Sequence, residues 1–143
     1  MHVDGRCHCG FVTYQAEIDP TTVVICHCTD CQLMSSSAFR MVVLARKGSF
    51  RLLSGEPTVY IKTADSGRKR AHSFCPKCGT PLFASPPGEN PEQHYGLRVG
   101  SIQQRTQLRP AKQLWCNSAF DWIKDITRIP ESESASLTPP PSR

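Results

Sequence analysis

Seven of the eight cysteines in this chain of 143 residues fall into three tight clusters, and this pattern constrains the fold more than any other feature. Three lie within residues 26–31, two within residues 7–9 and two within residues 75–78. Thiolates at such short spacings are ligands that a zinc ion selects. We therefore expect a fold held together around metal. The clustered cysteines are Cys7, Cys9, Cys26, Cys28, Cys31, Cys75 and Cys78.

The two outer clusters supply four thiolates, which is the complete ligand set of a closed tetrahedral zinc site. Gly79 follows the second pair directly, and glycine accepts the positive φ of a turn that aims amides at the sulfurs. A redox dithiol is the alternative, but it normally begins a helix in a βαβ setting that this sequence lacks. We predict a structural zinc on Cys7, Cys9, Cys75 and Cys78.

The central cluster differs because its three ligands leave one coordination position of the metal open. A zinc ion on Cys26, Cys28 and Cys31 would accept a water molecule or an incoming thiolate there. The alternative is a second structural zinc, completed by His27, by another side chain or by Cys116, the one cysteine outside the clusters. Two zinc ions per chain are expected, and the open site is the one expected to be only partly occupied.

Length and charge indicate one small domain. Hydrophobic residues make up 38% of the chain, so the core is lean and metal binding would add stability. The net charge of +5 is spread over scattered Lys and Arg, and the densest group, residues 68–70, is more typical of a solvated strand edge than of a nucleic-acid interface. We predict a zinc-binding β domain over residues 1–130 and a disordered tail rich in Ser, Pro and Glu over residues 131–143.

The sequence shows neither a signal peptide pattern nor an apolar run that would span a membrane. A cytoplasmic protein without a membrane partner is the expectation, and a reducing cytosol favours metal ligation over disulfides. A secreted disulfide framework would suit eight cysteines in number, but the export signal is missing.

Alternating and β-rich runs predict an all-β protein with at most a turn or two of helix. Residues 58–63 and 68–74 flank a turn signal and predict a hairpin that delivers the third cysteine cluster. Further strands are expected over residues 3–9, 11–17, 23–25, 38–45, 50–53, 81–84, 95–102 and 113–115.

Two expectations concern the direction of side chains. Residues two apart in a strand share a face, which would aim Cys7 with Cys9, and Cys26 with Cys28, at one ion. At the end of the chain, residues 122–126 are expected to pack on the sheet, and the lone Cys116 is expected to lie in the core.

Three motifs make the chain similar to a known family. They are Gly5-x-Cys7-x-Cys9-Gly10, then Cys26-His27-Cys28-x-x-Cys31, then Phe74-Cys75-x-x-Cys78-Gly79-Thr80. Together with residues 98–102 and 118–122, they resemble the glutathione-dependent formaldehyde-activating family, which also includes centromere protein V. The resemblance spans about residues 3–126.

The resemblance implies a β-tent of antiparallel strands, the fold shared with zinc-binding Rab-GTPase chaperones. It implies a structural zinc on the outer four cysteines and a catalytic zinc on the central three. The family's founding activity is that of a carbon–sulfur lyase that joins glutathione to formaldehyde, giving S-hydroxymethylglutathione.

Two functions follow as hypotheses. The first is a zinc-dependent carbon–sulfur lyase acting on a glutathione-like thiol adduct of a small aldehyde at the open site. Arg40, Arg46 and Arg98 are candidates to bind the carboxylates of the thiol, and His27 and the hydroxyls of residues 35–37 are candidates to supply a proton. The second is a non-catalytic, zinc-stabilised binding module with a partner surface at residues 68–70.

Overall fold

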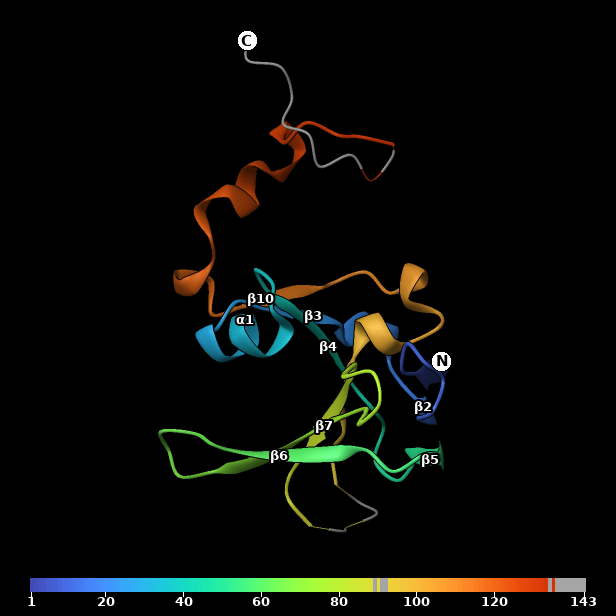
Figure 1. Ribbon diagram of the computed structural model, residues 1–143. Helices are drawn as coiled ribbons and strands as arrows, with labels where there is room; N and C mark the ends of the chain where they lie inside the picture. Colours follow the sequence, from blue (N-terminus) through green and yellow to red (C-terminus); the bar gives the residue numbers. More distant parts are fainter. Residues whose placement is uncertain (89, 91–92, 134, 136–143) are drawn as a thin grey trace.

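Two β-sheets form the main regular structure of the computed structural model, which describes residues 1–88, 90, 93–133 and 135 (Figure 1). Within these residues, all neighbouring strands pair antiparallel except β10, which runs parallel to β3. The predicted all-β fold is confirmed. The smaller sheet has the order β1 (His2–Arg6), β2 (Thr13–Glu17), β5 (Arg51–Ser54). The larger sheet has the order β10 (Lys112–Leu114), β3 (Val24–Cys26), β4 (Arg40–Leu44), β9 (Gly96–Arg98), β8 (Pro81–Ser85), β7 (Lys69–Phe74), β6 (Thr58–Thr63).

Helical structure is limited to short pieces in the described part of the chain. The α-helix α1 (Thr29–Ser35) follows β3 directly. The expectation of at most a turn or two of helix holds for the α-helical part, but the 3₁₀ segments exceed it. The remaining helical segments are 3₁₀ turns: η1 (Pro20–Thr22), η2 (Val99–Ser101), η3 (Arg105–Gln107), η4 (Cys116–Ser118) and η5 (Asp121–Arg128).

The core is built from buried side chains of both sheets. In β2, Tyr14 and Ala16 are buried and their neighbours are less so, which is the alternation of a strand with one covered face. Val43 of β4 and Leu97 of β9 belong to the same buried cluster. The core therefore joins the smaller sheet to the larger one.

The predicted strands are mostly confirmed, and the exceptions lie at cysteines and at one strand end. β6 and β7 form the expected hairpin with the turn between them. The strand predicted over residues 95–102 is shorter, because the chain enters η2 after Arg98. Strand β1 ends at Arg6, before its cysteine pair, and β3 ends at Cys26, so the cysteine pairs do not share a strand face as expected.

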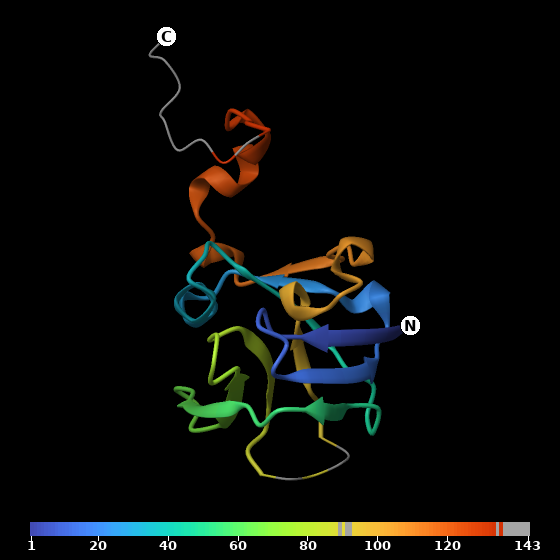
Figure 2. The same ribbon diagram turned by 45° about the vertical axis from the view of Figure 1, so that its right-hand side comes forward.

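The C-terminal segment corrects a second expectation. Segment η5 extends away from the two sheets in both views (Figures 1 and 2), and Trp122 and Ile126 are 46% and 52% exposed. Cys116 is exposed as well, so it is not a core residue. The chain turns at Trp115, whose φ is 56°, directly after β10 at the edge of the sheet, and the following segment therefore has no sheet face beneath it.

The tail predicted over residues 131–143 lies largely outside the described residues. Among those that are described, no helix is long and apolar enough to cross a membrane.

Tyr14 is the largest fully buried side chain, and its position depends on Gly5 in the neighbouring strand β1. Its hydroxyl hydrogen-bonds the Ser101 hydroxyl at 2.8 Å, and its ring stacks on Phe50. Burial raises the pKa of Tyr14 to about 12, so the phenol stays protonated. Gly5 pairs with Tyr14 across the strands, and a Cβ at Gly5 would lie 1.9 Å from Tyr14 Cζ.

Gly5→Ala is expected to lower the free energy of unfolding by about 1–3 kcal/mol, because the added methyl group must displace the buried Tyr14 ring. Urea unfolding of the zinc-loaded protein measures the change. Gly100→Ala is the matched control, since a Cβ there meets nothing within 4 Å, and it should change the free energy by less than about 0.5 kcal/mol. Equal effects of the two substitutions would contradict the prediction.

Candidate metal centres

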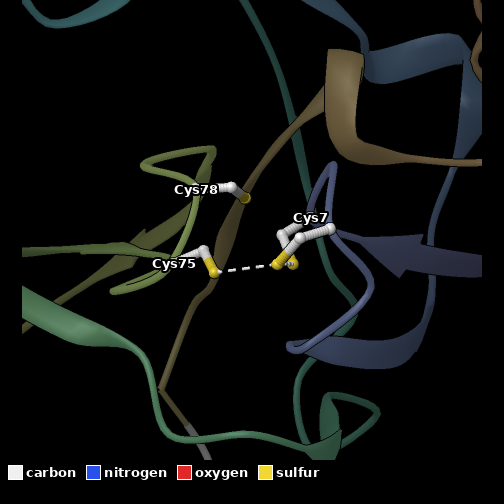
Figure 3. A group of neighbouring side chains, drawn as sticks. Cys7, Cys75 and Cys78 are labelled. Carbon is white, nitrogen blue, oxygen red and sulfur yellow. Dashed lines mark hydrogen bonds between the residues drawn. The ribbon is translucent and has the colours of Figure 1, made fainter.

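Two loops from different sheets bring the outer four cysteines together. The turn after β1 carries Cys7 and Cys9, and the turn after β7 carries Cys75 and Cys78. In the second turn the Gly79 amide donates to the Cys75 carbonyl at 2.9 Å, with a φ of 75° at Gly79. Figure 3 shows Cys7, Cys75 and Cys78 pointing toward one another between the loops. The turns, rather than strand alternation, aim these sulfurs at one point.

The spacing of the four sulfurs fits a zinc ion. The Sγ atoms of Cys7 and Cys9 are 3.6 Å apart, those of Cys9 and Cys75 are 3.7 Å apart, and all four lie within 4.8 Å of one another. A tetrahedral ion about 2.3 Å from each sulfur separates its ligands by about 3.8 Å. A disulfide would need about 2.05 Å. These four residues can hold zinc as a closed site.

Hydrogen-bond donors contact three of the four sulfurs, those of Cys7, Cys75 and Cys78. The amides of Val12 and Lys77 donate to the sulfurs of Cys7 and Cys75 at 3.2 and 3.4 Å. The Thr80 hydroxyl, 3.2 Å from the Cys78 sulfur, together with nearby backbone amides lowers the pKa of Cys78 to about 5. Hydrogen bonds to a thiolate favour the form that binds a metal.

The central three cysteines form a second group at the start of α1. Cys26 ends β3, Cys28 is the N-cap of α1, and the Cys31 amide donates to the Cys28 sulfur at 3.3 Å. All three sulfurs lie within 4.8 Å of one another. Among the described residues, neither His27 nor Cys116 belongs to this group. The structure thus gathers three thiols that could hold a metal ion, and a tetrahedral ion there would have its fourth position open to another group.

Mutual repulsion makes a cation favourable at this cluster. Burial and the neighbouring thiols of Cys28 and Cys26 raise the pKa of Cys31 to about 12. Adjacent thiolates cannot all ionise at neutral pH unless a positive charge offsets their repulsion. A divalent metal ion supplies that charge, and the donor set of three thiolates is one that zinc accepts.

The three-cysteine cluster opens into a cleft. Cys28 and Cys31 line a cavity of about 210 Å³, and a neighbouring cavity of about 440 Å³ is lined by residues of β6, β7, β8 and β9. The two cavities share four lining residues, and together they are here called the cleft. The shared residues are Met34, Arg40, His72 and Arg98.

The cleft is strongly basic. Arg40 of β4 is only 5% exposed, and among the described residues neither Arg40 nor Arg98 forms an ion pair with a carboxylate. Burial and the nearby Arg40 lower the pKa of Arg98 to about 9, so it is still charged at neutral pH. Lys62 also lines the space, but Asp30 of α1 pairs with it. Two guanidinium groups are therefore available to an anion.

Only some of the residues predicted to bind the thiol or to supply a proton line the cleft. Arg40 and Arg98 line the cleft, whereas Arg46 is exposed in the turn after β4. His27 is fully buried and bonds Gln113 Oε1 through Nε2 at 2.8 Å. The Ser35 hydroxyl donates to the Cys31 carbonyl at 2.6 Å, so it is already used within α1.

Two residues of this site, Arg70 and His72, were not assigned to it from the sequence. Arg70 and His72 lie two apart in β7 and both line the cleft, while Ala71 between them is buried on the other face. Arg70 also donates to the Ala84 carbonyl at 3.3 Å. The signal in the sequence was a basic residue and a histidine at strand spacing just before the third cysteine cluster.

Comparison with known proteins first identifies the fold. The chain is similar to the crystal structure of a Rhodobacter sphaeroides protein, with a TM-score of 0.58 and 23% identity, over 77% of this chain and 98% of that one.

Comparison of the sequences then identifies the family. The family model described as glutathione-dependent formaldehyde-activating enzyme matches residues 2–118. The chain belongs to this family. An uncharacterized lyase of Schizosaccharomyces pombe is 33% identical over 89 residues, which is 62% of this chain and 61% of that protein. The match therefore spans less than two thirds of that relative.

The two clusters are expected to differ in what their metal does for stability. Cys75→Ser should remove one zinc per chain and lower the free energy of unfolding by several kcal/mol, because metal binding at a closed site is worth about 10 kcal/mol or more. Cys28→Ser should remove the other zinc with a much smaller change in the unfolding temperature. Elemental mass spectrometry and thermal unfolding measure both effects.

Cys116→Ser is the control for both substitutions, because Cys116 is exposed and belongs to neither cluster. It should keep the metal content and the unfolding temperature of the wild type. An unchanged metal content in Cys75→Ser would contradict the assignment of the closed site.

Proposed function

We propose that the protein is a carbon–sulfur lyase that joins a glutathione-like thiol to formaldehyde or another small aldehyde, and cleaves the adduct in reverse. The main support is the incomplete ligand set of Cys26, Cys28 and Cys31 at the wall of a basic cleft. Family membership supports the same chemistry, and the name of the Schizosaccharomyces pombe relative supports the broader class of lyase.

The chemistry needs a thiolate held beside an aldehyde. A zinc ion on three thiolates supplies an electrophilic position that lowers the pKa of a fourth, incoming thiol. A sulfur electron pair forms the C–S bond with the aldehyde carbon, and the C=O π pair moves to oxygen. The thiol releases one proton and the oxygen gains one, so the reaction needs no oxidant or reductant.

The arginines of the cleft would orient the thiol. Glutathione carries two carboxylates, and guanidinium groups bind carboxylates through paired, charge-assisted hydrogen bonds. Arg40 and Arg98 line the same cavity as Cys28 and Cys31 and have no carboxylate partner among the described residues. Binding there would hold the thiol of the substrate at the cluster.

The non-catalytic binding module is the alternative. Its predicted surface, residues 68–70, is not one exposed basic patch, because Arg70 lines the cleft. Titration calorimetry of the zinc-loaded protein with glutathione tests this alternative directly, since a module without a thiol site would give no heat.

Cys28→Ser is expected to reduce the acceleration of S-hydroxymethylglutathione formation by about 100-fold or more, because the open metal position is lost. Exchange NMR on glutathione and formaldehyde measures the rate over the spontaneous reaction. Cys116→Ser should match the wild type. A zinc-loaded wild type that gives no acceleration would refute the proposed activity.

Arg40→Gln is expected to raise the KM for glutathione about tenfold or more, because one charge-assisted hydrogen bond is worth about 1.5–3 kcal/mol. The KM for 2-mercaptoethanol, which has no carboxylate, should change little. Arg46→Gln, at an exposed turn, is the matched control and should leave both values unchanged. Equal losses with both thiols would assign Arg40 to folding rather than to binding.

A further inference from the structure

We propose that His72 is a further catalytic residue of the cleft, whose Nε2–H donates a hydrogen bond to the substrate oxygen as negative charge develops on it. The inference rests on the proposed function, because it assigns a role within that site. His72 lies in β7 and lines both cavities that make up the cleft, as do Arg40 and Arg98.

An arginine fixes the tautomer of the His72 ring. The Nη2 atom of Arg98 is 3.1 Å from His72 Nδ1. Guanidinium is a donor only, so Nδ1 must accept and cannot carry a proton. The proton of the neutral ring therefore lies on Nε2, at the other side of the imidazole.

That Nε2–H donor has no partner among the described residues, and it is shielded from solvent. An unpaired buried donor costs about 1–3 kcal/mol, which an acceptor entering the cleft would recover. Met34 lines both cavities beside His72, and its unbranched side chain can yield to an incoming ligand. His72 therefore holds an oriented donor at the wall of the cleft, and this donor lacks an acceptor among the described residues.

The surroundings keep the ring neutral. Burial, then the charges of Arg98, Arg40, Lys62 and Arg70, lower the pKa of His72 to about 4. Asp30, the one carboxylate among the described lining residues, is paired with Lys62. His72 therefore keeps its single ring proton on Nε2 throughout the neutral range, where it acts as a hydrogen-bond donor rather than as a proton source.

The proposed reaction creates the acceptor that this donor lacks. Attack of the thiolate on the aldehyde carbon forms the C–S bond and moves the π pair to oxygen, which becomes an alkoxide and then takes a proton from water. A fixed donor that meets this oxygen stabilises the transition state more than the neutral aldehyde. Arg40, Arg70 and Arg98 add positive charge to the lining of the cleft.

The test compares three variants of the zinc-loaded protein in the exchange NMR assay. His72→Leu is expected to lower kcat about 100-fold with little change in the KM for glutathione, as for loss of one oxyanion donor. His72→Gln keeps an N–H at a similar reach and should recover at least tenfold of that loss. His94→Leu is the matched control, since His94 is exposed, and should leave kcat unchanged.

Each contrary result overturns the role of His72. An unchanged kcat in His72→Leu shows that no catalytic donor was lost. A glutamine variant as slow as the leucine variant shows that the N–H is not what matters. Loss of one zinc in His72→Leu makes the residue a metal ligand instead. A kcat that follows an ionisation near pH 6.5, lost in His72→Leu, makes His72 a titrating group.

A measurement without turnover separates this inference from the proposed function. In ¹⁵N-labelled protein, the His72 Nε2–H proton should shift downfield with glutathione plus formaldehyde, whose adduct bears a hydroxyl, but not with S-methylglutathione. A chemical shift change without faster adduct formation refutes the lyase activity but supports the contact between His72 and the adduct. Acceleration without a shift refutes the role of His72 and keeps the lyase.

Discussion

The gathering of four sulfurs between the loop after β1 and the loop after β7 is the constraint on which the rest of the site depends. β1 belongs to the smaller sheet and β7 to the larger, so a metal held there fixes one sheet against the other. The hydrophobic core is small, and metal–thiolate bonds would add stability that apolar burial does not supply. Because β7 also carries Arg70 and His72, a metal ion on the four cysteines would also fix the position of one wall of the cleft.

Most features that could be predicted depend on neighbours in sequence. The exception is the grouping of Cys7 and Cys9 with Cys75 and Cys78, which the count of four thiolates predicted between distant parts of the chain. The cysteine groups and the β6–β7 hairpin follow from short spacings and a turn. The cleft combines α1 with strands that come from separate parts of the chain. Arg40 and Arg46 are equivalent by chemistry and lie six residues apart, yet only Arg40 lines the cleft. Which arginine faces a site is decided by strand ends and pairing, and the sequence pattern left these open.

Some predictions reached the right grouping for a wrong physical reason. Cys26 and Cys28 were expected to share a strand face, but the strand ends at Cys26 and the helix start places Cys28 beside it. Apolar residues near the C-terminus were expected to pack on the sheet, since apolar side chains usually find a core. The turn at Trp115 leads that segment off the edge of the sheet, and hydrophobicity alone does not encode this direction.

Cys28 belongs both to the start of α1 and to the central cysteine cluster, so the folding of α1 is linked to metal binding at that cluster. Its sulfur caps α1 and is also one of only three thiolates in the central cluster. A helix of seven residues is too short to be stable by itself. Metal binding at this cluster would therefore be coupled to the ordering of the start of α1. If ordering α1 uses part of the binding free energy, we expect this centre to hold a metal ion less tightly than a site whose ligands are already in place.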